Sequence, residues 1–139
     1  MKDKFKKAYM EAALVFSRLS YAKRRKVGAV IVKDDTIIGI GYNGTPPGWW
    51  NECEDDEGKT TPFVIHAEQN ALDKIVRSSV SSIGAYLFVT TAPCIDCAKR
   101  ILGAKIQKVY YLDEYHNQDG IAFLERAGIP CEQVQLCDD

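Results

Sequence analysis

The segment AYLFVTTAPCIDCAKRILGAKIQKVYYL, residues 85–112, decides the fold because it alternates strand, helix and strand. Two apolar runs, 85–91 and 106–112, are predicted strands, and the stretch 94–102 between them is a predicted helix. A strand, a helix and a second strand joined in this way form a parallel pair with a right-handed connection. The segment therefore predicts one half of an α/β sheet.

The N-terminal part of the chain predicts a helix packed by one apolar face. Apolar residues between positions 5 and 16 recur at a spacing of three to four, which is typical of an amphipathic helix. Asp3 is suited to cap its start, and the pattern extends to about Ser20.

A β-hairpin and further helices complete the predicted fold. β-branched runs at 27–32 and 36–42 flank a turn-forming pair of aspartates, which favours a hairpin. A helix is expected at 66–76, another at 120–127 with Gly after its end, and a fifth strand at 130–136. We therefore expect one domain, residues 1–139, with a three-layer α/β/α sandwich around a five-stranded mixed sheet.

Composition excludes several classes of partner. The 139 residues are 46% hydrophobic, and 18 basic against 19 acidic side chains give a formal charge of −1. No global field draws such a chain to polynucleotides or anionic membranes, and charged residues interrupt the N-terminus where a signal peptide or membrane span would be apolar. We expect a cytoplasmic protein. An odd number of cysteines then favours thiols or metal ligands over disulfides, and they are Cys53, Cys94, Cys97, Cys131 and Cys137.

The residues with the most chemistry are His66, Cys94 and Cys97. A catalytic zinc ion takes three nitrogen or sulfur ligands and leaves its fourth position to water. Two cysteines three apart at a helix start lie on one face of the first turn, where the helix dipole favours thiolates. Glu68, two residues after the histidine, is placed to accept a proton from bound water without being a ligand. A thioredoxin-like redox pair and a structural zinc site are the alternatives, but neither requires that glutamate.

The spacing H-x-E followed by P-C-x-x-C is typical of zinc nucleobase deaminases. The chain also resembles the deoxycytidylate deaminases of the cytidine deaminase superfamily over nearly its whole length. The resemblance rests on residues 26–30, 41–46, 66–71 and 93–99 and on Tyr115-His116. It implies a cytidine deaminase-like fold with one catalytic zinc ion per chain, and hydrolysis of dCMP to dUMP and ammonia, which supplies dUMP for thymidylate synthesis.

The resemblance also implies how a nucleotide would be held. Zinc-activated water would attack C4 of cytosine while Glu68 transfers protons to N3 and to the departing amine. The main chain of Ala67 and Ala92 would contact the pyrimidine. The sugar and phosphate would meet residues that match the family motif or belong to the basic run before the hairpin, namely Arg24, Lys26, Asn43, Thr45 and Tyr115. A phosphate calls for such cationic and polar donors, although a solvated basic turn is the other interpretation of the run.

The long aperiodic segment 43–62 carries the remaining expectations. Loops of this length in compact domains are commonly functional. Adjacent Trp49 and Trp50 would suit a subunit contact or a bound nucleotide, and the family resemblance implies a homo-oligomer, most commonly a hexamer. The resemblance further implies activation by dCTP and inhibition by dTTP. The acidic run 54–57 would hold Mg²⁺ bridging a triphosphate, with a solvated acidic loop as the other interpretation.

Three other functions compete with this one. A free cytidine or deoxycytidine deaminase would need no phosphate-binding cluster. A tRNA adenosine deaminase would need an extended basic surface, against which the charge of −1 argues. A non-catalytic zinc nucleotide-binding protein would have no use for Glu68.

Overall fold

The computed structural model describes residues 1–136 and contains four helices and five strands within that range. Their bounds are α1 Asp3–Ser17, β1 Gly28–Lys33, β2 Thr36–Tyr42, α2 Ala67–Val76, β3 Tyr86–Thr91, α3 Ile95–Gly103, β4 Lys108–Asp113, α4 Asp119–Arg126 and β5 Cys131–Gln133. Each predicted helix and strand is present within a few residues of its expected position.

The strands form one mixed sheet in the order β2-β1-β3-β4-β5. β1 pairs antiparallel with both β2 and β3, whereas β3, β4 and β5 run parallel. The β1–β2 hairpin turns through Asp34 and Asp35, whose φ angles of 52° and 58° are left-handed, a conformation that aspartate tolerates better than most residues. The hairpin and the parallel pair across α3 are both confirmed.

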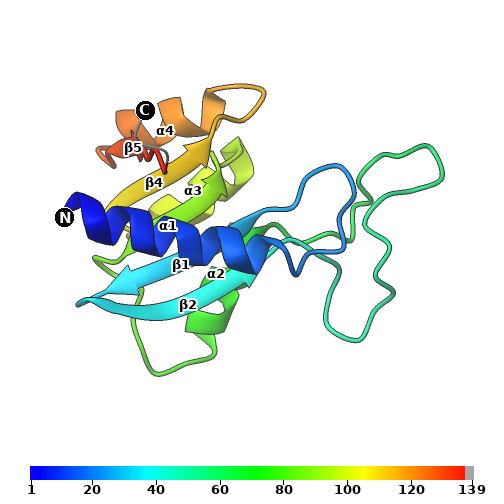
Figure 1. Cartoon of the computed structure of the whole chain (residues 1–139), viewed down its shortest axis with the longest axis horizontal. Helices are drawn as coiled ribbons and strands as arrows, with labels where there is room; N and C mark the ends of the chain where they lie inside the picture. Colours follow the sequence, from blue (N-terminus) through cyan, green and yellow to red (C-terminus); the bar gives the residue numbers. More distant parts are fainter. Residues whose placement is uncertain (137–139) are drawn as a thin grey trace.

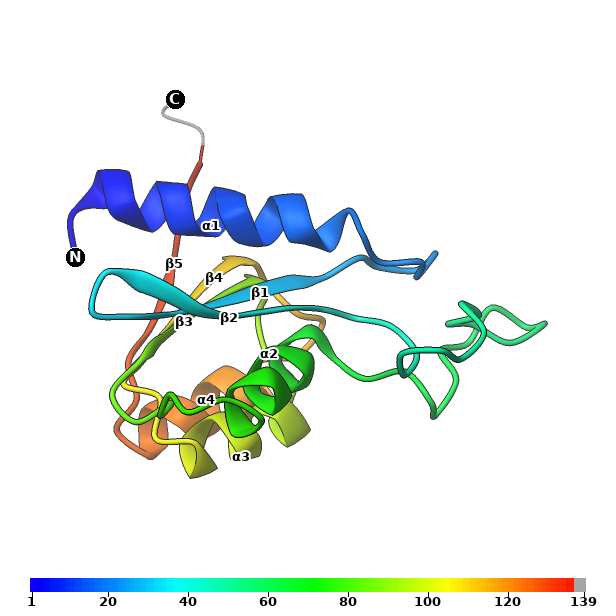
Figure 2. The same ribbon diagram turned by 90° about the horizontal axis from the view of Figure 1, so that it is seen from below.

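Helices cover both faces of the sheet. Figure 2 shows α1 along one face and α2, α3 and α4 together against the other. The predicted three-layer α/β/α sandwich is therefore confirmed. β1 lies inside the sheet and has five consecutive buried residues, as a strand covered on both faces should.

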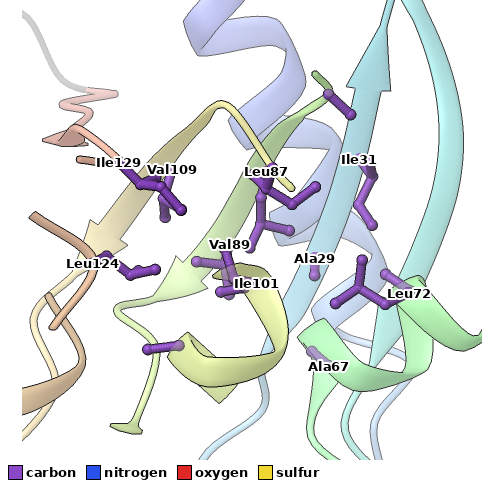
Figure 3. Close-up of a cluster of buried hydrophobic side chains, with 14 of the residues drawn as sticks. Ala29, Ile31, Ala67, Leu72, Leu87, Val89, Ile101, Val109, Leu124 and Ile129 are labelled. Carbon is purple, nitrogen blue, oxygen red and sulfur yellow. The ribbon is translucent and has the colours of Figure 1, made fainter. Parts of the chain in front are cut away.

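Two apolar clusters join these layers. The larger one fills the space between the sheet and α2, α3 and α4, where Figure 3 shows Leu87 and Val89 of β3 beside Ile101 of α3. The smaller one lies under α1 and includes Met10 and Phe88, both fully buried. Because β3 contributes to both clusters, its position is fixed from both sides.

Two glycines allow helix ends to approach the rest of the fold closely. A Cβ atom at Gly41 in β2 would overlap the carbonyl of Ala67, the first residue of α2. A Cβ at Gly120 in α4 would overlap the carbonyl of Pro93, just before α3. Larger side chains would displace the starts of α2 and α3 from their present positions.

Some predicted boundaries differ from the structure. Asp3 is the first residue of α1 rather than its cap: Lys2 occupies the cap position, and Asp3 faces Lys6 at 3.7 Å. An acidic first-turn residue still interacts favourably with the helix dipole. The last turns of the predicted helix, up to Ser20, form tight i→i−3 turns after Ser17 instead.

The cysteines and the helix lengths bear on the expected free thiols and on the expectation that no segment spans a membrane. Within residues 1–136 the four cysteines are free thiols, and Cys137 lies outside the described residues. No helix in this range has the length and apolarity that crossing a membrane requires.

Outside the sandwich, the segment between β2 and α2 projects from one end of the molecule (Figure 1). A bridge between Gly44 and Ile65 closes its base, and a second bridge pairs Glu54 with Thr60. The segment is therefore an ordered loop with its own backbone pairing.

Candidate metal centre and adjoining cavity

His66, Cys94 and Cys97 come together at the starts of two helices. His66 is the cap residue of α2, Cys94 is the cap residue of α3, and Cys97 lies in the first turn of α3. Their ligand atoms all lie within 4.8 Å of one another. Among residues 1–136 this is the one group of three or more such side chains close enough to hold a metal ion.

The spacing of the donor atoms fits a tetrahedral zinc ion. The Nδ1 atom of His66 lies 3.3 Å from Cys97 Sγ and 3.6 Å from Cys94 Sγ. Bond lengths of about 2.0 Å to nitrogen and 2.3 Å to sulfur give tetrahedral N···S edges of about 3.5 Å. The cluster therefore matches zinc in both donor type and size, with a position left for water.

The two thiols differ in their readiness to ionise. The hydrogen bond from Cys97 lowers the pKa of Cys94 to about 3, whereas the same contact and burial raise the pKa of Cys97. The hydrogen bond with Cys94 also raises the pKa of His66. The pair shares a proton that a divalent metal would displace, since zinc binds thiolates.

Glu68 lies in the first turn of α2 and is only 4% exposed. Burial raises the pKa of its carboxyl group to about 7. A carboxyl group that titrates near neutral pH can both accept and return a proton, as general acid–base catalysis requires. It lines the same cavity as His66 and Cys94.

This cavity has a volume of about 480 Å³, in the range of small-molecule sites. His66 and Cys94 of the metal cluster line it together with Glu68, Ala67 and Ala92. Arg24, Arg25, Asn43 and Tyr115 also line it. One hollow therefore joins a metal centre to a basic wall.

Five of the seven predicted substrate-binding residues line this cavity: Arg24, Asn43, Ala67, Ala92 and Tyr115. Lys26 does not, and instead lines a separate surface hollow with Arg18. Thr45 also lies elsewhere, where its hydroxyl donates to the Trp50 carbonyl at 2.6 Å.

Asn43 uses its carboxamide to hold the basic segment in place. Its Nδ2 donates to the Arg25 carbonyl and its Oδ1 accepts from the Val27 amide, both at 2.9 Å. Its own carbonyl accepts from the hydroxyl of Ser20 at 2.7 Å. Asn43 thus joins the end of β2 to the chain that leads into β1.

Sequence reasoning missed several residues of the cavity wall. Arg25 donates to Thr91 Oγ1 at 3.3 Å and to the Glu114 carbonyl at 3.5 Å, which fixes its guanidinium at the wall. His116 packs on Tyr115 with ring centroids 3.9 Å apart. Glu54 reaches the wall from the projecting loop. The basic run indicated Arg25 as much as its neighbours, whereas the acidic run 54–57 indicated Glu54 only as a candidate Mg²⁺ ligand and not as part of this wall.

Comparison with known proteins places the chain in a family. Residues 3–113 match the model described as "Cytidine and deoxycytidylate deaminase zinc-binding region". The chain belongs to this family of zinc deaminases. The family and the His-Cys-Cys cluster together support zinc as the metal of this site.

Relatives extend the match over almost the whole chain. ComE operon protein 2 of Bacillus subtilis is 37% identical over 134 residues, which cover 92% of this chain and 70% of that protein. The deoxycytidylate deaminase of Saccharomyces cerevisiae is 30% identical across 100% of this chain, which spans only 47% of the yeast enzyme. The dCMP deaminase of cyanophage S-TIM5, solved with dCMP and dUMP, is 50% identical with a TM-score of 0.94, covering 96% of this chain and 98% of that one.

Proposed function

We propose that this protein is a zinc-dependent dCMP deaminase that hydrolyses dCMP to dUMP and ammonia within a single domain. The observation that carries the proposal is the meeting, in one cavity, of the His66-Cys94-Cys97 cluster with Glu68 and a wall of arginines. The likeness to the cyanophage enzyme, whose structure contains dCMP and dUMP, supports this choice of nucleotide.

The zinc ion would be held by His66, Cys94 and Cys97 and would acidify a water molecule for attack on C4 of the pyrimidine. Glu68 takes the proton from that water and delivers it to N3. It would then accept a second proton from the hydroxyl group added at C4 and transfer it to the exocyclic amine, which leaves as ammonia when the C4–N bond breaks. Its burial suits this exchange, because a carboxyl group with a pKa near 7 binds and releases protons at neutral pH.

The main chain beside the metal would orient the base. Ala67 begins α2, where backbone amides are unpaired within the helix, so its amide can donate to the pyrimidine carbonyl. Ala92 lies directly after β3, and its amide is already bonded to the Asp113 carbonyl at 2.8 Å. That bond holds in place the residue whose carbonyl would accept from the exocyclic amine. Specificity for cytosine thus depends on backbone positions.

The arginine wall would hold the 5′-phosphate. Arg24 and Arg25 line the cavity, and Tyr115 adds a hydroxyl beside them. Planar guanidinium groups bind phosphate oxygens through paired, charge-assisted hydrogen bonds. We therefore assign Arg25 the phosphate contact that the sequence had suggested for Lys26.

Assembly and regulation are further parts of the proposal. Trp49 and Trp50 are 52% and 83% exposed on the projecting loop, which supports a contact between subunits of a homo-oligomer, expected to be a hexamer. Activation by dCTP and inhibition by dTTP would act through the same loop. Glu54 and Asp55 of the acidic run accept hydrogen bonds from backbone amides, so Mg²⁺ bound with a triphosphate would compete with these donors at the bonded oxygens.

The decisive experiment measures zinc content and ammonia release with dCMP, deoxycytidine, CMP and dCTP as substrates. We expect one zinc ion per chain and a kcat/KM for dCMP far above that for deoxycytidine, because the arginine contacts require the phosphate. Equal efficiency on the nucleoside would move the protein to the cytidine deaminase class. Zinc binding without turnover of any substrate would indicate a nucleotide-binding protein.

A further inference from the structure

Glu54 brings a carboxylate from the projecting loop to the basic wall of the cavity. Its two oxygens each lie 3.1 Å from the Lys23 amide nitrogen, and one lies 3.3 Å from that of Arg24. The residue lines the same cavity as Arg24, Arg25 and the metal cluster. A negative group therefore sits directly against the segment that carries the phosphate-binding arginines.

Within the described residues 1–136, no lysine or arginine side chain is found in an ion pair with this carboxylate. Its hydrogen-bond donors are neutral backbone amides, and none of the ion pairs found in residues 1–136 involves Glu54. Glu132, in contrast, contacts two lysine ammonium groups at 2.8 and 3.0 Å. Glu54 thus keeps its charge at the cavity wall and also occupies two amide donors that an incoming anion would use.

These two properties oppose the entry of a second phosphate group. A single 5′-phosphate can take the guanidinium groups of Arg24 and Arg25. A diphosphate would bring about one to two more negative charges toward the same wall. The backbone amides of Lys23 and Arg24 at this wall already donate to Glu54. Like charges at short range in a partly enclosed site repel each other strongly.

We propose that Glu54 is a specificity residue that restricts the phosphate site to nucleoside monophosphates. The proposal rests on the proposed function, since it concerns the phosphate end of the same substrate site. It assigns to the loop a role in selection that is separate from any contact between subunits.

A purely structural role for Glu54 would affect nucleotide binding differently from a role in selection. If its hydrogen bonds only held Lys23 and Arg24 in place, loss of those bonds would weaken the binding of monophosphates and of diphosphates by the same factor. If its charge selects between them, loss of the charge changes the ratio of the two affinities. The ratio of inhibition constants for dUDP and dUMP therefore distinguishes the two roles.

The experiment measures competitive inhibition of dCMP deamination by dUMP and by dUDP in the zinc-loaded enzyme. In the wild type we expect dUDP to bind about tenfold more weakly than dUMP or worse. Glu54→Gln retains one oxygen for the backbone amides but loses the charge, and should reduce that ratio by about fivefold or more. Glu52→Gln is the matched control, because Glu52 is an exposed residue of the same loop and its substitution changes the net charge equally.

Three results would overturn the proposal. They are wild-type enzyme that binds dUDP as tightly as dUMP, a ratio unchanged in Glu54→Gln, and an equal fall of the ratio in Glu52→Gln. Should Glu54→Gln fail to fold, the wild-type ratio at rising ionic strength gives the answer: salt screens the repulsion and lowers the ratio, whereas an insensitive ratio contradicts it. If the wild type does not deaminate dCMP, the proposed function fails, and calorimetry with dUMP and dUDP still tests Glu54.

Discussion

Glu68 and Glu132 lie on opposite sides of the sheet and show how the same type of side chain takes a different role in each environment. Glu68, in α2, is 4% exposed, and burial raises the pKa of its carboxyl group to about 7. Glu132, in β5, faces α1, and hydrogen bonds from Lys6 and then Lys108 lower the pKa of its carboxyl group. Burial outweighs the attraction of His66 and raises the pKa of the first, whereas paired lysines keep the second ionised and make it a structural link.

The difference extends to the surroundings of each group. The α2 and α3 side gathers thiols, an imidazole and a cavity at helix starts, where backbone amides are unpaired. On the α1 side, both lysines that bond Glu132 also lie over the ring of the buried Tyr110, at 5.7 and 4.8 Å from its centroid. Substitutions on the first side should therefore change chemistry, and those on the second should change stability.

The largest expected effect comes from removing a metal ligand. Cys94→Ala should lose both bound zinc and dCMP deamination, because two remaining ligands hold the ion poorly. Zinc analysis and an ammonia assay on the purified variant would measure this. Cys131→Ala, which removes a thiol outside the cluster, is the control and should retain both. Full zinc content in Cys94→Ala would contradict the assigned ligand set.

A smaller but still large effect is expected from Glu68. Glu68→Gln should retain zinc and lose about 10²- to 10⁴-fold in kcat, because it removes the proton carrier and no ligand. Glu132→Gln makes the same chemical change on the other side of the sheet and should leave kcat unchanged. Comparable kcat values for the two variants would remove the functional distinction between the two glutamates.

Removing one phosphate contact should cost less. Arg25→Ala should lower kcat/KM for dCMP by about 10- to 100-fold, the range for a hydrogen bond to a charged group, and leave deoxycytidine almost unaffected. Lys26→Ala removes the same charge one residue later and should change little, because Lys26 lies outside the cavity. A larger loss in Lys26→Ala would restore the sequence-based assignment.

These variants also mark where sequence reasoning succeeds and where it ends. The hairpin and the parallel pair of the mixed sheet could be predicted because hairpin and crossover geometry are local and the handedness of the crossover is fixed. His66, Cys94 and Cys97 were found because their spacing is tied to two helix starts. The sequence could not show that Arg25 lines the cavity and Lys26 does not, since the placement of this segment depends on the hydrogen bonds of Asn43. The acidic run included Glu54, but its place at the cavity wall could not be predicted, because its contact to Lys23 joins segments 31 residues apart without any repeat or motif.

The smallest expected effect is on stability and depends on pH. Glu132 has a pKa below its ordinary value of 4.5 in the folded protein, so folding favours its ionised form. Its pairing with the lysines therefore stabilises the fold at pH values above 4.5, and this contribution is lost as pH falls through the lower folded-state pKa. Glu132→Gln should thus reduce the free energy of unfolding near pH 7, by less than about 1 kcal/mol because the side chain is partly exposed to solvent.

The pH dependence separates this pairing from simple loss of packing. Urea unfolding of the wild type and of Glu132→Gln at pH 7 and at about pH 3 would measure the difference at each pH. The difference between the two proteins should narrow at the lower pH, because the contribution of the Glu132 carboxylate is lost as pH falls through its folded-state pKa. A difference of the same size at both pH values would mean that Glu132 stabilises the α1 side by shape and not by charge. The contrast with Glu68 would then rest on burial alone.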